Sequence, residues 1–419
     1  GIVQKVVSSK TTTTKDTVDF SEKMDRILLH KVWGLPIFFG VMWLAFKLTF
    51  DIAMPFVDWV DGAFSGPLMK WVTIFLEGIK APEWLVSLAT EGVISGVGFI
   101  LVFVPIIMAM MLMITFLEGS GYMARAAFVM DRLMKSMGLH GKSFIPLLMG
   151  FGCNVPSIYA TRSLESQRDR ILTALIVPLM SCGARLPVYV LFVAAFFPNN
   201  PSLVLFSIYA LGIALAVVMG VIFKKTLFQG ETAMFIIELP PYRMPTFKNL
   251  AIHTWEKGKH FLIKAGTYIF AVSIFVWFLL NMPWGVEDKK DSFLGKTGQI
   301  IAPVLSPIGF GTWEAASSLV TGIIAKEIIV GTMGEIYSVE IGDDEESTTT
   351  FGEDMAELGT SFLTAAKGAV HNVVSTVGIS SLAVEDDGST NTLKSVMKTK
   401  FTPLSAFSFM VFEIGRAHV

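Results

Sequence analysis

The 419-residue sequence is 53% hydrophobic and only 16% charged, with 34 Phe, 22 Met and a mean hydropathy of +0.60. An ordinary soluble domain carries roughly 25% charged residues, so this composition excludes a soluble protein and predicts an all-α polytopic membrane protein, in contact with lipid. The formal net charge of −2, without a dense basic block, indicates no nucleic-acid partner, and two cysteines do not make a disulfide framework.

The first predicted membrane span is Trp33–Phe50, close to the length needed to cross about 30 Å of hydrocarbon. The polar residues 1–32 precede it and carry several Lys and Arg, so we expect them to be a cytoplasmic linker from a domain upstream. Residues 51–91 mix acidic side chains with tryptophans, which is typical of helices lying in the outer interface of the membrane.

A first repeat unit is predicted over residues 92–223, and its opening span, Gly92–Leu117, returns the chain to the cytoplasm. The following apolar run, Phe144–Ala160, is short and begins and ends on the cytoplasmic side, which predicts a re-entrant hairpin. Broken backbone survives in a membrane only where it is buried in protein or lines a polar cavity. The predicted interruptions are at Gly150, Gly152 and Pro156.

A second broken segment, Ile171–Phe197, crosses outward, and Leu203–Phe223 returns to the cytoplasm. The breaks of this segment are predicted at Pro178, Gly183 and Pro187. Residues 224–264 hold seven Lys and Arg residues. This composition predicts an amphipathic cytoplasmic segment on the membrane surface.

The plan repeats over residues 265–338 in the opposite orientation. Ala265–Met282 crosses outward, a short run with Gly309 and Gly311 follows, and Leu319–Tyr337 crosses back. The tripeptide Gly-Phe-Gly at Gly309–Gly311 lies 159 residues after its counterpart at Gly150–Gly152. Two such units of opposite orientation predict an inverted-repeat transporter whose site lies where the broken segments meet.

The last part of the chain is more polar. We expect residues 339–402 to be a cytoplasmic polar insertion, because an acidic, turn-rich stretch opens it. Residues 403–412 are predicted to begin another, truncated transmembrane helix. Residues 413–419 are expected to be an artefact outside the fold.

Each of the two breaks in the first unit carries a lone cysteine, Cys153 or Cys182. Thiolate and thioether donors suit a soft or borderline metal ion, so both cysteines are candidate ligands, although free Cys is also a common small buried hydrophobe. Met180 is a weaker candidate, since Met also fills apolar cores. Asn154 either supplies an oxygen donor or caps the broken helix.

Charged residues at or within apolar segments are candidates because burying a charge in a membrane is costly. Glu118 and Glu327 are therefore candidate metal ligands, although Lys326 beside Glu327 also suggests a structural ion pair. Arg185 follows Cys182 by three residues and would repel a cation, so we expect a carboxylate or carbonyl partner for it. None of the histidines falls inside a predicted span, and no catalytic residue is predicted.

Several long motifs resemble the membrane domain of the ferrous iron transport protein B (FeoB) family. The resemblance extends over roughly Asp25–Phe412. It is carried by the segments GFGCNVPSIYATRSLESQRDR, MSCGARLPVYVLF, LEGSGYMARAAFVMDRLM, TGIIAKEIIVGT and DRILLHKVWGLPIFFGVMWLAFKLTF.

This resemblance implies inward transport of Fe²⁺ across a prokaryotic inner membrane through two gate regions, with a cytoplasmic N-terminus. It also implies an N-terminal GTPase domain that binds GTP and Mg²⁺, and it is compatible with a small cytoplasmic accessory protein and with homo-oligomers. The sequence departs from that pattern because it contains no GxxxxGK[ST] motif. Gly141-Lys142-Ser143 supplies only the end of one, so we expect no enzyme activity from this chain.

Other functions remain open at this point. Similar gate regions would suit another divalent metal or a nucleoside, and a non-transporting membrane platform would need no ligand path. The run Gly119-Ser120-Gly121 suggests an intramembrane hydrolase, but no intramembrane histidine is available as its base.

Overall fold

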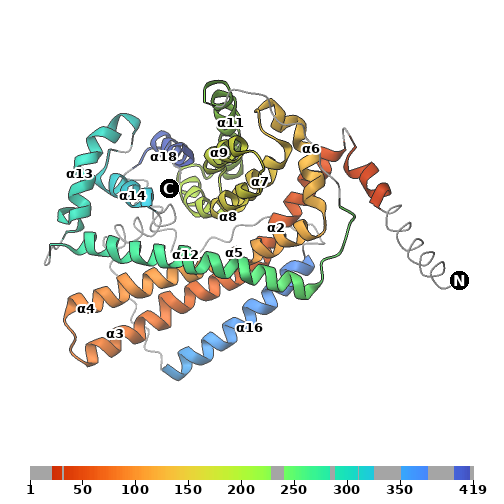
Figure 1. The fold of residues 1–419 in the computed structure, drawn as a ribbon. Helices are drawn as coiled ribbons and strands as arrows, with labels where there is room; N and C mark the ends of the chain where they lie inside the picture. Colours follow the sequence, from red (N-terminus) through yellow and green to blue (C-terminus); the bar gives the residue numbers. More distant parts are fainter. Residues whose placement is uncertain are drawn as a thin grey trace. The chain divides into compact units, whose positions relative to one another are not determined.

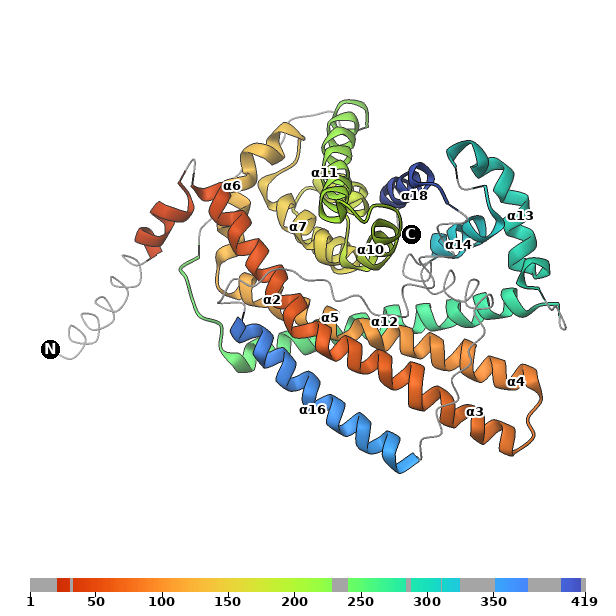
Figure 2. The same ribbon diagram turned by 180° about the vertical axis from the view of Figure 1, so that it is seen from behind.

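The computed structural model describes residues 21–30, 33–227, 240–283, 288–309, 311–324, 351–375 and 401–415. Within these ranges all regular secondary structure is helical, which confirms the all-α fold class (Figures 1 and 2). The chain forms two compact units. The first consists of residues up to Phe50, Ile107–Val177 and Ala216–Lys259, and the second of Asp51–Ile106, Pro178–Leu215 and residues from His260 on.

The first helix is much longer than the predicted span. Helix α2 (Gly34–Ala63), the π-helical turn η1 (Phe64–Leu68) and helix α3 (Met69–Gly78) form one continuous stretch of 45 residues. At 1.5 Å per residue it is about 68 Å long, roughly twice the hydrocarbon thickness. Phe50 is therefore not a helix end, and residues 51–78 extend the first span. The wider π turn contains Pro67, whose ring would clash with an ordinary α-helical turn.

Two more continuous helices are long and apolar enough to cross a membrane. One is Glu83–Gly119, built from α4 (Glu83–Ser87), η2 (Leu88–Ile94) and α5 (Ser95–Gly119), and the other is α11 (Pro201–Thr226). They contain the predicted spans at 92–117 and 203–223.

Helix α12 (Phe247–Asn281) differs from its prediction. It joins the apolar stretch Gly266–Asn281 to the basic residues before it without a break. Residues 247–264, which we expected to lie on the membrane surface, therefore continue directly into the apolar stretch Gly266–Asn281.

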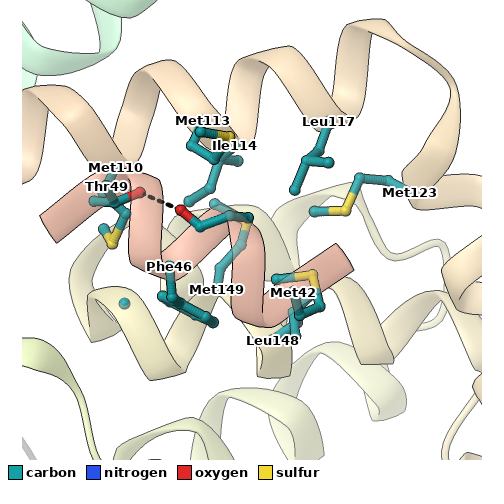
Figure 3. A pocket seen from close by; sticks show the side chains of 12 residues that line it. Met42, Phe46, Thr49, Met110, Met113, Ile114, Leu117, Met123, Leu148 and Met149 are labelled. Atoms are coloured by element: carbon teal, nitrogen blue, oxygen red, sulfur yellow. Dashed lines mark hydrogen bonds between the residues drawn. The ribbon is translucent and has the colours of Figure 1, made fainter. Parts of the chain in front are cut away.

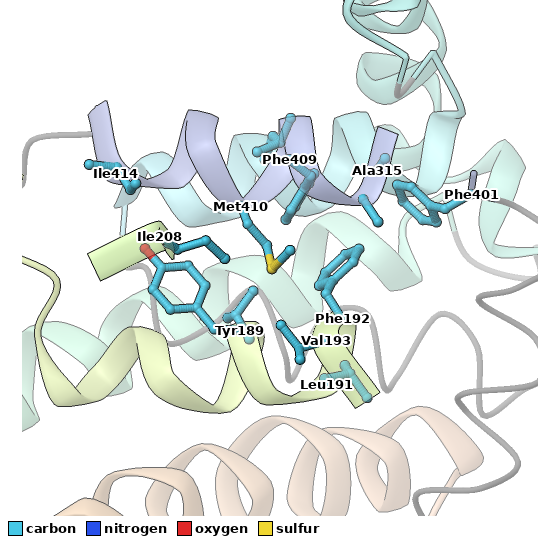
Figure 4. Packing of buried hydrophobic residues seen from close by; sticks show 13 residues of the cluster. Tyr189, Leu191, Phe192, Val193, Ile208, Ala315, Phe401, Phe409, Met410 and Ile414 are labelled. Atoms are coloured by element: carbon cyan, nitrogen blue, oxygen red, sulfur yellow. The ribbon is translucent and has the colours of Figure 1, made fainter. Parts of the chain in front are cut away.

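The core of the second unit joins segments that are far apart in sequence. Helices α10 (Leu186–Phe196), α11, α14 (Trp313–Ile324) and α18 (Pro403–Gly415) contribute its buried side chains (Figure 4). The Phe192 ring stacks on Phe409 at a centroid distance of 5.0 Å and meets Phe401 edge-on at 5.5 Å. Helix α18 is therefore an integral part of this core, and it includes residues 413–415, which we expected to lie outside the fold.

Helix α16 (Phe351–Ser375) lies against the second half of the first long helix, within the second unit (Figure 2). Near its start, Asp354 accepts a 2.8 Å hydrogen bond from Trp71 Nε1. Near its end, the Asn372 amide donates to the Asp51 carbonyl at 3.4 Å. The two helices therefore run antiparallel along residues 51–71.

The topology expected from sequence places residues 51–91 outside the membrane and residues 339–402 inside. Helix α16 belongs to the second range and hydrogen-bonds to the first. A helix with the charged residues Asp354, Glu357 and Lys367 is poorly suited to cross the hydrocarbon, so this packing favours one side for both segments. The side on which they lie stays a prediction.

We predict that residues 51–71 and α16 lie on the same side of the membrane. In a Cys153→Ser, Cys182→Ser background, Gly62→Cys and Gly359→Cys introduce thiols at positions where an added side chain meets nothing within 4 Å. Both should react with a membrane-impermeant maleimide from the same side of intact cells. Ser163→Cys, in the Arg-rich loop, serves as the cytoplasmic control. Labelling of Gly62→Cys and Gly359→Cys from opposite sides would contradict the packing.

Candidate functional site

The first broken segment is a helical hairpin in the first unit. Helix α7 (Phe144–Gly152) ends at Cys153, whose backbone is extended at φ −150° and ψ 126°, and α8 (Asn154–Ala160) follows. The Ser157 hydroxyl donates to the Pro146 carbonyl, 11 residues earlier. In a continuous helix these residues would be about 16 Å apart, so α8 folds back on α7. The predicted break is confirmed, and it lies at Cys153.

The three residues predicted to interrupt this segment have different roles. Gly150 lies inside α7 and Pro156 in the first turn of α8, where a missing N–H costs no helical hydrogen bond, so neither breaks its helix. Gly152 ends α7, and a Cβ on it would collide with the sulfur of Met110. Glycine at this position therefore leaves room for the Met110 side chain of α5.

Asn154 follows the break and is 3% exposed. Neither its amide oxygen nor its amide nitrogen has a hydrogen-bond partner. A buried polar group left unpaired costs about 1–3 kcal/mol, and such groups in native proteins often mark a ligand or water site. Asn154 thus presents an unused oxygen donor next to Cys153, which is half-buried. Of the two roles considered from sequence, the helix cap is absent, since no side chain caps α8.

The second broken segment begins in the first unit, which includes its residues up to Val177, and continues from Pro178 in the second unit. Helix α9 (Gln167–Ile176) leads into a 3₁₀ turn at Val177–Leu179, Cys182 is extended, and a second 3₁₀ turn at Gly183–Arg185 precedes α10. This confirms the break predicted near the middle of residues 171–197. Pro187 lies in the first turn of α10 and does not interrupt it.

Arg185 is fully buried and stabilises this break. Its guanidinium donates to the Pro178 carbonyl at 2.9 Å and to the Met180 carbonyl at 3.4 Å. The carbonyl partner expected for Arg185 is therefore confirmed. Two of the carbonyls released by the break are already engaged by a cation, so they are not free donors for an ion.

The remaining sulfur candidates of this segment are buried in the second unit. Cys182 is 3% exposed and Met180 5% exposed, and neither cysteine of the chain forms a disulfide. Cys153 and Cys182 belong to different units. That the two breaks face one another stays a prediction.

A third break occurs at the second Gly-Phe-Gly tripeptide. Helix α13 (Phe293–Leu305) and the 3₁₀ turn Ser306–Ile308 end at Gly309, whose φ of +95° favours glycine. A Cβ on Gly311 would come within 2.8 Å of the Ser306 backbone. Helix α14 then folds back on α13, since the Ser317 hydroxyl donates to the Leu294 carbonyl at 3.2 Å. Both tripeptides therefore lie at the turn of a helical hairpin, although Phe310 is outside the described residues.

Of the two carboxylate candidates, only Glu118 lies among the described residues. Glu118 ends α5 with a side chain 65% exposed, and it forms a 3.0 Å ion pair with Lys257 of α12. The free-energy cost of burying a carboxylate in an apolar segment is thus avoided, because Glu118 is exposed and pairs with Lys257. The sequence spacing revealed neither feature. Lys326 and Glu327 lie outside the described residues.

Two motif-like runs are structural. The Ser120 hydroxyl donates to the Leu117 carbonyl at 2.9 Å and accepts from the Tyr122 amide, so it caps the turn between α5 and α6 (Tyr122–Ser136). Lys142 donates to Glu165 at 2.7 Å from a 3₁₀ turn, with no strand before it. This hydrogen bond lowers the pKa of Glu165 below its usual range.

A buried charged cluster, which sequence reasoning missed, joins three segments of the first unit. Arg125 on α6 is 2% exposed and binds both carboxylate oxygens of Asp25, at 2.6 and 3.2 Å. Its guanidinium stacks 3.7 Å from the Tyr242 ring, whose hydroxyl donates to Asp25 at 3.1 Å. Burial raises the pKa of Tyr242, which keeps its hydroxyl protonated as a donor. The cluster ties the helical residues 21–28 to α6.

We predict that Arg185→Met destabilises the protein, because the Pro178 and Met180 carbonyls lose their donor. The expected loss is about 1–3 kcal/mol for each carbonyl left unpaired. Arg185→Lys, which keeps the charge but not the planar fork, should lose less. Denaturant unfolding in detergent, followed by tryptophan fluorescence, measures the change. The exposed Arg162→Met should stay within about 0.5 kcal/mol of the parent protein, and equal stability of both Met variants would contradict the role of Arg185.

Comparison with known proteins gives two family matches. The family described as Gate, nucleoside recognition, matches residues 100–196 and 262–413, which is more than half of the chain. The family described as ferrous iron transport protein B C terminus matches residues 205–257. No solved structure matches the chain.

Relatives of established name cover most of the chain. The Fe(2+) transporter FeoB of Staphylococcus aureus strain COL is 48% identical over 77% of this chain and 49% of the relative. A protein of Porphyromonas gingivalis named as a fusion of Fe(2+) transport protein A and FeoB is 41% identical over 82% of the chain and 44% of the relative. FeoB of Salmonella typhimurium is 39% identical over 96% and 53%. The chain therefore spans about half the length of these relatives, and it belongs to the ferrous iron transport protein B family.

Proposed function

We propose that this chain is the membrane part of an inner-membrane transporter that moves Fe²⁺ into the cytoplasm by way of its broken helices. The observation that carries the proposal is the buried, unpaired amide of Asn154, next to Cys153 at the turn between α7 and α8. The relatives named as Fe(2+) transporters indicate which ion such a site takes.

At the first break, Fe²⁺ exchanges some of its water ligands for the Asn154 oxygen and the Cys153 sulfur. Fe²⁺ accepts both oxygen and sulfur donors, and a site with few protein ligands binds weakly enough to release the ion again. The unpaired amide costs stability in the empty protein, and this cost is recovered when the ion is bound.

At the second break, Cys182 and Met180 are the candidate sulfur donors. The Arg185 cation would repel Fe²⁺ and already engages the Pro178 and Met180 carbonyls. Passage of the ion therefore requires the guanidinium to move, which makes this break a closed gate. The inverted repeat and the meeting of both breaks near the midplane are part of the same proposal.

The membrane topology follows from the basic residues. Lys23 and Arg26 precede the first span, so we infer a cytoplasmic start and an outer position for residues 51–78. Because α16 is hydrogen-bonded to residues 51–71, we infer that it is also outside.

We propose that GTP binding is coupled to Fe²⁺ transport through the buried charged cluster of Asp25, Arg125 and Tyr242. The matched part covers only about half of each relative, and we infer that the remaining part of the relatives contains the GTP- and Mg²⁺-binding domain. Motion of that domain would reach residues 21–28 and pass through Asp25 and Arg125 to α6, which packs against α7. The fused relative makes a small accessory protein a reasonable partner on that side.

A second candidate function is transport of a nucleoside, favoured by the description of the Gate family. In proteoliposomes, quenching of a trapped metal-sensitive dye by Fe²⁺ or Mn²⁺ and uptake of radiolabelled nucleosides separate the two. Nucleoside uptake without Fe²⁺ entry would replace the iron proposal.

Asn154→Leu tests the ligand at the first break. We expect Fe²⁺ uptake to fall at least about tenfold, as when a metal site loses a supporting group. Stability should be equal or higher, because an apolar side chain replaces an unpaired polar one. The assay is radiolabelled iron uptake by cells with a chimera of this chain and the unmatched part of the S. aureus relative.

Cys153→Ser should also lower Fe²⁺ uptake in this assay.

The matched control for Asn154→Leu is Asn199→Leu, at an exposed residue of the predicted outer turn, and this variant should retain uptake. An Asn154→Leu protein that is less stable but transports normally would assign Asn154 a structural role.

Arg125→Met and Asp25→Asn test the coupling. Each should reduce GTP-dependent uptake by the chimera, and the double variant should be little worse than either single variant, because both remove the same contact. Lys135→Met, which breaks a more exposed ion pair with Asp131 on the same helix, is the control. Additive losses of Arg125→Met and Asp25→Asn would show that the pair does not act as a unit.

A further inference from the structure

Methionine is the commonest residue lining a small, partly open cavity in the first unit. Side chains from α2, α5, α6 and α7 surround it (Figure 3). Five of its twelve lining residues are Met, whereas the whole chain has 22 Met in 419 residues, so the enrichment is several-fold. These methionines are Met42, Met110, Met113, Met123 and Met149.

The size of the cavity limits what it can hold. Its volume is about 20 Å³, which is room for one water-sized occupant. A nucleoside or an ion with its hydration shell is too large. An occupant must therefore be a single atom that exchanges its water for protein donors.

The donors are soft and uncharged. Besides the thioether sulfurs, the cavity offers only the Thr49 hydroxyl, whose proton is donated to the Ala45 carbonyl at 2.8 Å. Among the described residues no group of three or more His, Cys, Asp and Glu could hold a metal ion. A divalent ion such as Fe²⁺ would be left with its charge uncompensated in an apolar cavity, at high cost. Thioether donors select Cu(I), which carries a single charge.

We propose that this cavity is a binding site for a soft monovalent metal ion, Cu(I), held by methionine sulfurs. Met110 and Met113 are two of these ligands and come from the same stretch of α5, and Met110 packs against Gly152 at the end of α7. None of the proposed iron ligands lines the cavity, although Gly152 of its lining precedes Cys153, and the inference does not depend on the proposed function.

The test uses Ag⁺, a redox-stable substitute for Cu(I), and the full chain with Cys153→Ser and Cys182→Ser, so that no thiol competes. After Ag⁺ addition and desalting, the purified protein should retain about one silver ion per chain by mass spectrometry, as expected for a thioether site. Met110→Leu with Met113→Leu should abolish this retention. Leu conserves the volume, so the fold should tolerate it.

The matched control is Met134→Leu with Met137→Leu, two buried methionines of the same unit that do not line the cavity. It should retain the silver. NMR of ¹³C-methyl methionine in the chain without Met substitutions gives a second measurement that needs no folded variant. The Met110 and Met113 methyl signals should shift on Ag⁺ addition. Unmoved signals, or silver retained by the Met110→Leu, Met113→Leu protein, would overturn the proposal.

Discussion

Backbone groups released by a helix break inside an apolar bundle need hydrogen-bond partners, and this requirement governs the structure. At the second break the buried Arg185 guanidinium supplies donors to the Pro178 and Met180 carbonyls. At the first break the Ser157 hydroxyl donates to the Pro146 carbonyl, and the side-chain amide of the buried Asn154 has no partner. The carbonyls of one break are therefore engaged by an internal cation, while the other break retains an unpaired polar group. Two segments that look alike in sequence thus differ in how their polar groups are paired.

Close approach of backbone is the second recurring feature. Gly152 ends α7 against the Met110 sulfur, and Gly298 on α13 leaves room for Ser317 of α14. A Cβ at Gly298 would collide with Ser317 and the Trp313 carbonyl, so glycine allows the α13–α14 hairpin to close, whereas Gly152 leaves room for a side chain of α5. The contact between Gly152 and Met110 also places the Met110 sulfur beside the first break. Both residues line the methionine-rich cavity, so this cavity reaches the end of α7. Small residues thus decide where helices can fold back, and methionine fills the irregular space around them.

Polar contacts outside the spans organise the rest of the chain. Asp25, Arg125 and Tyr242 bring a segment before the first span, helix α6 and the approach to α12 into one buried cluster. In the second unit, Asp354 accepts hydrogen bonds from α3 and anchors α16. Because buried charges are costly to separate from their partners, each cluster is suited to move as one body. A signal from the cytoplasmic side would then act on α6 and α7 together.

The amino-acid sequence by itself determined the fold class, the apolar segments at 33–50, 92–117 and 203–223 that lie in long helices, and the presence of breaks near Cys153, Cys182 and Gly309. Composition and hydropathy suffice for these, since a chain in lipid must satisfy its backbone within helices or closed barrels. Only the tertiary structure decided that Cys153 rather than Gly150 or Pro156 interrupts the first segment, that Glu118 pairs with Lys257, and that α16 lies along residues 51–71. These outcomes depend on contacts between residues that are distant in sequence, and no local spacing encodes the packing that brings such residues together.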